Sequence, residues 1–191
     1  MSKLKKVIIA GLLLATTIVL NRFLSIKTPI LIISFSFIPV MLSGLILGPW
    51  WTMTIAGLAD LIGALLFPFG AYFPGYTLSA IISGFIYGFF LYKQKNSTNK
   101  KLIINLIISC ILVLVICNSF LNSIWIYITS KKAIWAILPT RLIKQLIMLP
   151  IQIVTIYIIN IGLNKMGIYN RLFQDNFNQV EDEKGDANDK I

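Results

Sequence analysis

The sequence has no histidine and few acidic residues, and these absences exclude several classes of enzyme. Without histidine, a zinc membrane protease, a Ser–His intramembrane protease and a histidine-dependent lipid phosphatase are excluded, because each needs an imidazole for its chemistry. Asp60 is the only acid before Asp175, so no second carboxylate lies near it in the sequence to form an acid–base pair. No GxxxxGK[ST] phosphate-binding loop occurs, so we do not expect the chain to hydrolyse ATP. Enzyme functions are disfavoured.

Cysteine is scarce as well, and the two cysteines give no sign of a disulfide. Cys110 and Cys117 fall in one predicted helix, about 10.5 Å apart along its axis. That separation is too large for a disulfide bond. We expect both to be ordinary buried apolar residues.

The net charge of +10 does not indicate a nucleic-acid partner. A nucleic-acid site needs basic residues interleaved with solvent-facing aromatic residues, and no stretch of the chain has that pattern. All acids other than Asp60 lie between Asp175 and Asp189, so the positive excess belongs to the flanks of the apolar segments. We expect no binding to nucleic acid.

Apolar residues are abundant, at 57% of the chain against 13% charged, with a mean hydropathy of +0.83. Residues 102–128 include no charge, and about 20 apolar residues suffice for a helix to cross the hydrocarbon layer. Open strands would leave backbone groups unpaired in lipid. We expect an all-α membrane protein with six transmembrane helices in one compact bundle, in a lipid bilayer. The expected spans are 4–25, 34–48, 50–67, 76–93, 102–128 and 135–163.

The two ends of the chain set the expected domain boundaries. Residues 1–6 followed by an apolar run resemble a signal peptide, but residues 7–20 contain no convincing small-x-small cleavage site. We therefore expect the first span to be retained. Residues 1–167 should form the transmembrane domain, and residues 168–191 a polar cytoplasmic tail without fixed structure.

Basic residues in short loops predict the orientation, because they favour the cytoplasmic side. Both termini are expected in the cytoplasm. With that orientation, the outer flanks carry only Lys27, Lys131 and Lys132. The cytoplasmic flanks carry Lys3, Lys5, Lys6, Lys93, Lys95, Lys100, Lys101, Lys165 and Arg171.

A few charged and amide side chains fall inside the expected spans, all in the outer half of the membrane. Intramembrane charges are costly and usually face a cavity or a charged partner. Three cations stand against one acid, Asp60, so an anionic ligand would supply the missing negative charge. Alternatively, Asp60 only neutralises a cation and holds the bundle together. The candidate ligand-binding residues of the spans are Arg22, Asp60, Asn118, Asn122, Trp125, Arg141, Lys144 and Gln145.

Residues 67–76, here called the aromatic segment, form a second candidate feature. The sequence Phe-Pro-Phe-Gly-Ala-Tyr-Phe-Pro-Gly-Tyr contains five aromatic residues, two prolines, two glycines and no charge. An aromatic belt at the membrane interface would explain part of this composition. Proline and glycine also shape a defined loop, and such a loop would suit a lid over a flat aromatic ring.

Several motifs along the chain form a recognisable set: Phe37-Ile-Pro-Val, Gly48-Pro-Trp, Asp60-Leu-Ile-Gly63, the aromatic segment with Thr77, and Leu138-Pro-Thr-Arg-Leu-Ile-Lys144. In these motifs the chain resembles the folate-specific substrate-binding subunits of energy-coupling factor (ECF) transporters. The resemblance extends to about Gly167. It implies a six-helix fold, high-affinity capture of folate outside a bacterial plasma membrane, and no cofactor. The implied partners are a transmembrane energy-coupling subunit and two ATPase subunits.

The resemblance to folate-binding subunits gives the candidate residues roles. The pterin ring would stack on Tyr72, Phe73 and Tyr76. Its amino-pyrimidinone edge would meet either Asp60 or the Asn118/Asn122 pair. The two carboxylates of the glutamate tail would meet the surplus cations Arg22, Arg141 and Lys144.

The resemblance also implies a contact between the first helix and the coupling subunit. Family members use a small-residue patch there, for which Gly11 and Ala15 are the nearest match. Residues 11 and 22 lie within about 20° of the same helix face. A straight helix therefore cannot easily direct Gly11 to a partner and Arg22 to a pocket, and a bend or another contact face is needed.

Two other functions stay open. A binding subunit for another vitamin or precursor, such as pantothenate, would have a single carboxylate on its ligand and leave one cation unexplained. A membrane assembly protein would use the same polar groups only to lock its helix bundle.

Overall fold

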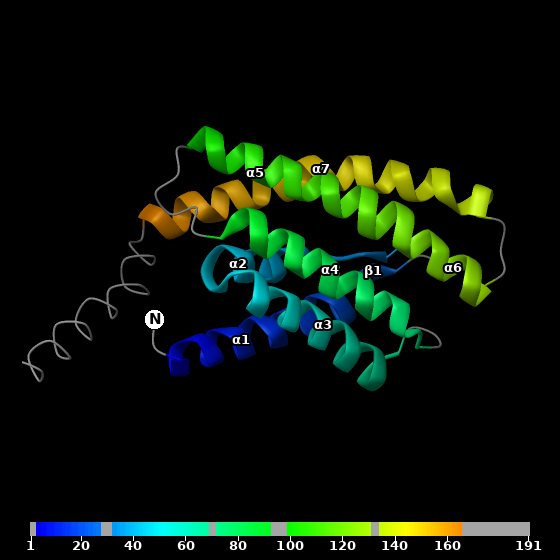
Figure 1. Cartoon of the computed structure of the whole chain (residues 1–191), viewed down its shortest axis with the longest axis horizontal. Helices are drawn as coiled ribbons and strands as arrows, with labels where there is room; N and C mark the ends of the chain where they lie inside the picture. Colours follow the sequence, from blue (N-terminus) through cyan, green and yellow to red (C-terminus); the bar gives the residue numbers. More distant parts are fainter. Residues whose placement is uncertain (1–2, 28–31, 69–71, 93–98, 131–133, 166–191) are drawn as a thin grey trace, which may run out of the picture.

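The computed structural model describes residues 3–27, 32–68, 72–92, 99–130 and 134–165, without the side chains of residues 26–27, 32–33, 99, 130, 134–142 and 164. Helices dominate it (Figure 1). The expected tail, residues 168–191, lies outside the described part of the chain. The elements are α1 (Lys3–Arg22), β1 (Ile26–Lys27), β2 (Ile32–Ile33), α2 (Phe37–Leu47), α3 (Pro49–Leu66), α4 (Pro74–Leu91), α5 (Asn99–Leu112), η2 (Val113–Leu121), α6 (Asn122–Ser130) and α7 (Ile134–Lys165).

Within these described ranges, five helical stretches are long and apolar enough to cross a membrane. α2 is equally apolar but has only 11 residues, about 16 Å at 1.5 Å per residue. That length is well short of the hydrocarbon layer. The five stretches are Lys3–Arg22, Pro49–Leu66, Pro74–Leu91, Lys100–Thr129 and Ile143–Leu163.

The helices pack as a bundle, and one side of the bundle is a long continuous helical rod. α5, η2 and α6 follow one another in that rod and lie beside α7, while α1 lies on the opposite side, with α2, α3 and α4 between (Figure 1). α3 and α4 pack against each other most extensively. The fully buried core includes Met41, Leu91, Leu106 and Ile156. The free cysteines Cys110 and Cys117 are also buried, as expected.

Glycine and proline end the helices where the sequence predicts a break. α2 ends before Gly48, whose φ of 91° is a left-handed conformation that few other residues adopt. Pro49 then begins α3, where its fixed φ suits the first turn and its missing N–H costs nothing. Pro74 begins α4 in the same way.

The expected span 102–128 is confirmed as one helical stretch, Lys100–Thr129, but its middle is not α-helical. η2 is a nine-residue π-helix between α5 and α6, and its hydrogen bonding extends to the N–H of Asn122, which donates to the carbonyl of Cys117 five residues earlier. π-helical turns are rare and often occur at functional sites. The sequence Val-Leu-Val-Ile-Cys-Asn-Ser-Phe-Leu has no proline or glycine to mark the change.

The expectation of an all-α fold also needs a small correction. β1 and β2 pair antiparallel, with Ile26 opposite Ile33 and Lys27 opposite Ile32. The chain reverses direction here between α1 and α2. The pairing satisfies backbone groups that would otherwise lack partners near an apolar phase.

Small residues let α4 approach its neighbours closely. A Cβ on Gly88 would lie 2.4 Å from Cα of Pro49, and one on Gly84 would lie 2.8 Å from the carbonyl oxygen of Thr52. On α2, a Cβ on Gly44 would lie 3.1 Å from the carbonyl oxygen of Tyr87. The absence of side chains at these glycines therefore sets the distance between the helices.

We expect Gly88→Ala to lower the melting temperature in detergent, because the new methyl group would meet the backbone of Pro49 rather than a movable side chain. Overpacking of this kind costs about 1–3 kcal/mol. The matched control is Gly162→Ala, since no atom lies within 4 Å of the position of its Cβ. Equal melting temperatures for the two variants would contradict this packing.

Candidate ligand-binding site

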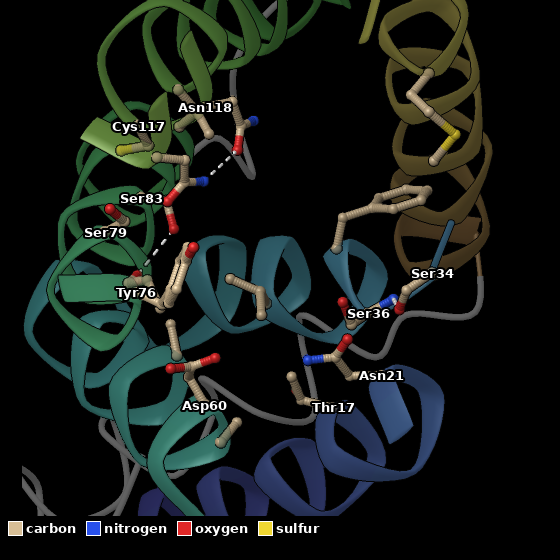
Figure 2. Close-up of a pocket in the computed structure, with 18 of the residues that line it drawn as sticks. Thr17, Asn21, Ser34, Ser36, Asp60, Tyr76, Ser79, Ser83, Cys117 and Asn118 are labelled. Carbon is tan, nitrogen blue, oxygen red and sulfur yellow. Dashed lines mark hydrogen bonds between the residues drawn. The ribbon is translucent and has the colours of Figure 1, made fainter. Parts of the chain in front are cut away.

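A cavity of about 800 Å³ opens among the helices. This volume is in the range of small-molecule binding sites. Its lining comes from the last part of α1, the segment before α2, the start of α2, α3 from Ala56 onward, the aromatic segment, α4 as far as Tyr87, the stretch from the end of α5 through η2 to α6, and α7. Several of these parts meet at the end of the bundle opposite the start of α1 (Figure 1). Side chains from α1, α3, α4 and η2 surround the open space in Figure 2.

Arg22 and Asp60 form an ion pair on one wall of this cavity. Arg22 Nη2 lies 4.0 Å from Asp60 Oδ1, and the two side chains are 7% and 24% exposed. The guanidinium also donates to the carbonyl oxygen of Asp60 at 3.5 Å and to that of Phe67 at 3.3 Å. It passes close over Gly63, where a Cβ would lie 2.6 Å from Arg22 Nε. The pair therefore links the end of α1 to α3 and to the start of the aromatic segment.

Thr77 of α4 is not a lining residue but contacts Asp60 of this wall, and sequence reasoning gave it no role of its own. Its hydroxyl donates to Asp60 Oδ2 at 2.8 Å. The hydroxyl of Tyr72 lies 3.2 Å from Thr77 Oγ1. Asp60 is thus shared between Arg22 of α1 and Thr77 of α4.

Amide groups form the opposite wall. Asn122 Nδ2 donates to Asn118 Oδ1 at 3.3 Å, and Asn118 projects toward the open space (Figure 2). Among the described residues, neither Asn122 Oδ1 nor Gln145 Oε1 has a hydrogen-bond partner, although both atoms are buried. Lys144 and Gln145 also line the cavity, from α7. Buried acceptors without donors carry a desolvation cost that a ligand N–H would remove.

Phe73, Tyr76 and Trp125 form an aromatic cluster beside the cavity, which Phe73 and Tyr76 line. Phe73 packs against Tyr76 and Trp125, with ring centroids 6.1 and 5.6 Å apart. Trp125 Nε1 donates to Ser79 Oγ at 3.0 Å. A Cβ on Gly75 would lie 2.5 Å from both Phe73 and Trp125, so only glycine leaves room for this arrangement. Residues 69–71 of the aromatic segment lie outside the described part of the chain.

Most residues that the sequence singles out for ligand binding therefore meet in one place. Trp125 is not among the lining residues but supports Phe73 from behind. The side chain of Arg141 lies outside the described residues. The lining includes Arg22, Asp60, Tyr72, Phe73, Tyr76, Asn118, Asn122, Lys144 and Gln145.

Several hydroxyl and amide residues of the lining were missed by sequence reasoning. On α4, a periodic signal exists, because Tyr76, Ser79, Ser83 and Tyr87 recur at helical spacing and all line the cavity. Other missed lining residues lie at the end of α1 and before α2, and they include Thr17, Asn21, Ser34 and Ser36. No comparable pattern marks them, since serine and threonine are common in membrane helices.

The α1 face with Gly11 and Ala15 lies away from the cavity. Both residues are exposed, and no atom lies within 4 Å of the position of a Cβ on Gly11. Arg22, expected on nearly the same face, is nevertheless buried. It is the last residue of α1, and its long side chain extends over Gly63 to reach Asp60. The length of the Arg22 side chain therefore lets it reach Asp60 while Gly11 and Ala15 remain exposed.

The family described as ECF transporter, substrate-specific component, matches residues 5–160, which include every cavity residue named above. The chain belongs to this family. It is therefore a multi-pass membrane transport component and not an enzyme.

Two relatives and one solved structure are similar over most of the chain. "Folate transporter FolT" of Clostridium novyi (strain NT) is 43% identical over 157 residues, covering 82% of this chain and 88% of the relative. "Folate transporter FolT" of Leuconostoc mesenteroides subsp. mesenteroides is 35% identical over 154 residues, covering 78% and 80%. The solved structure is described as "Crystal structure of FolT bound with folic acid". It is 40% identical with a TM-score of 0.70, covering 80% of this chain and 89% of that one.

Proposed function

We propose that this substrate-specific component binds folate with high affinity on the outer side of a bacterial plasma membrane and delivers it inward. The observation that carries the proposal is the likeness to FolT solved with folic acid, at 40% identity and a TM-score of 0.70. The names of the two FolT relatives support the same ligand. So does a cavity of about 800 Å³ that combines aromatic, amide and charged walls.

Each part of folate has a chemically suitable wall in this cavity. The pterin ring would stack against Tyr72, Phe73 and Tyr76. Its amino-pyrimidinone edge presents adjacent N–H donors and acceptors, which suit either Asp60 or the Asn118/Asn122 amides. The two glutamate carboxylates would meet the cations Arg22, Arg141 and Lys144, of which Arg22 and Lys144 line the cavity.

Delivery requires partners that hydrolyse ATP, because the sequence has no nucleotide-binding loop. We propose a transmembrane energy-coupling subunit and two ATPase subunits, with the exposed α1 face of Gly11 and Ala15 in contact with the coupling subunit. In addition to the five long stretches, residues 34–48, which contain the short helix α2, would make a sixth crossing and place both termini in the cytoplasm. The nine-to-three distribution of basic residues between the two sides supports this orientation.

We expect the purified chain to bind folate in detergent but not to accumulate it when it is reconstituted alone into vesicles containing ATP. Binding needs only the cavity, whereas accumulation needs an energy source. Equilibrium binding measurements with a panel of vitamins that includes pantothenate distinguish a folate-binding subunit from a subunit that binds another vitamin or precursor. Binding of none of the panel would favour an assembly protein, and ATP-driven uptake by the chain alone would refute the proposed role.

Replacing Lys144 or Arg141 with Met should weaken folate binding if either holds the glutamate tail. The loss of one charge-assisted hydrogen bond predicts about 1.5–3 kcal/mol, or roughly 10- to 150-fold in Kd. Affinity for a pterin without the tail should change little, and isothermal titration with both ligands measures the difference. Unchanged folate affinity in both variants would remove the charge argument for an anionic ligand.

Asp60→Asn is the informative control for these cation variants. If Asp60 only balances Arg22, the substitution should lower the melting temperature and leave the affinity for both ligands unchanged or improved. If Asp60 reads the pterin edge, affinity should fall for folate and for the tail-less pterin alike. The two roles of Asp60 are thus separated from the role of the α7 cations.

Gly11→Leu and Ala15→Leu should impair assembly with the coupling subunit and transport, while folate binding in detergent stays intact. Bulky side chains prevent close helix approach, and both positions are exposed away from the cavity. Co-purification with the coupling subunit and vesicle uptake measure the first effect. Equal loss of binding would instead place this face in contact with the ligand.

A further inference from the structure

Thr77 behaves differently from other helical threonines of this chain. A threonine hydroxyl in a helix usually donates to the carbonyl four residues earlier. That bond occurs at distances of 2.7–2.9 Å in five described cases: Thr16, Thr17, Thr52, Thr54 and Thr129. Thr77 instead donates across to Asp60 Oδ2 on α3, at 2.8 Å. Its hydroxyl is therefore committed to joining two helices rather than to its own helix.

The number of hydrogens that each group can donate sets the direction of the hydrogen bonds among Tyr72, Thr77 and Asp60. Thr77 has one hydroxyl hydrogen, and the ionised Asp60 carboxylate can only accept, so that hydrogen is directed to Asp60. Thr77 Oγ1 is then left as the acceptor for the hydroxyl of Tyr72, 3.2 Å away. The order is Tyr72 O–H to Thr77 O–H to the Asp60 carboxylate. Bonds linked in this way polarise one another.

We propose that Thr77 is a positioning residue that ties Tyr72, and through it the cluster of Phe73, Tyr76 and Trp125, to the Asp60 carboxylate on the cavity wall. Through its two bonds, Thr77 fixes Asp60 Oδ2 on one side and the ring of Tyr72 on the other. Tyr72 is followed by Phe73, which packs on Tyr76 and Trp125. The hydrogen bond between Thr77 and Asp60 therefore influences how firmly Tyr72 and Phe73 are held at the cavity.

This inference rests on the proposed function for its consequence. A folate molecule bound beneath Tyr72 and Phe73 must displace these rings to leave. Weakening the bond chain should speed dissociation, because the rings that must move before folate leaves are held less firmly. The size of the effect should be modest, since Tyr72 is 40% exposed and its bond competes with water.

The test compares Thr77→Val with Thr77→Ser, Tyr72→Phe, the Tyr72→Phe/Thr77→Val double variant and the control Thr54→Val. Valine keeps the shape of threonine but cannot donate or accept, and serine keeps the hydroxyl. Thr54 bonds only to its own helix and is exposed. Stopped-flow measurement of folate association and dissociation gives both rate constants.

We expect Thr77→Val to raise the folate dissociation rate constant roughly 3- to 10-fold. Thr77→Ser and Thr54→Val should remain near the wild type. The double variant should dissociate no faster than Thr77→Val alone, because both substitutions break one chain. Additive effects, no rescue by serine, or unchanged dissociation in Thr77→Val would each overturn the proposal.

A ligand-free measurement separates this inference from the proposed function. In a background with Trp50, Trp51 and Trp135 replaced by Phe, acrylamide quenching reports the exposure of Trp125, which packs on Phe73. Thr77→Val should increase quenching, while Thr77→Ser and Thr54→Val should not. If the wild type binds no folate but this pattern holds, the proposed ligand is wrong and the positioning role stands. Equal quenching in all variants would refute the positioning role.

Discussion

One carboxylate connects three helices of this bundle. Asp60 is the only acid among the described residues, and a lone charge at membrane depth must find partners. It lies near Arg22 from α1 and accepts a hydrogen bond from Thr77 of α4, while belonging itself to α3. Arg22 extends the link to the carbonyl of Phe67. The position of the aromatic segment relative to the cavity depends on this set of contacts.

Close helix packing brings these partners within reach of Asp60. α3 and α4 can share a carboxylate only because Gly84 and Gly88 let their backbones approach, and Gly63 leaves the path that Arg22 follows. Side chains at these glycines would separate the helices or deflect the guanidinium. The spacing of the helix backbones therefore decides which polar contacts Asp60 can make.

Local signals in the sequence predict much of this fold but not its tertiary details. Long apolar runs predict the helices, and Gly48-Pro49 predicts the break before α3, because both signals lie within a few residues of their effect. The π-helical turns around Cys117 and the β1–β2 pairing leave no such signal. In the site, Asp60 and Lys144 are conspicuous because charge is rare in a span. Thr77 is not, because its role depends on a partner 17 residues away on another helix.

The structural and ligand-reading roles of Asp60, which the sequence presents as alternatives, are compatible. Its contact with Arg22 is 4.0 Å, at the limit for an ion pair, and its side chain remains 24% exposed on the cavity wall. An ionised carboxylate has about four acceptor positions, of which Thr77 uses one. Donor groups of a ligand would therefore add to these contacts rather than replace them. They would also exclude water, which strengthens the attraction between Asp60 and Arg22. A weakly paired acid can thus stabilise the empty bundle and remain available to a ligand.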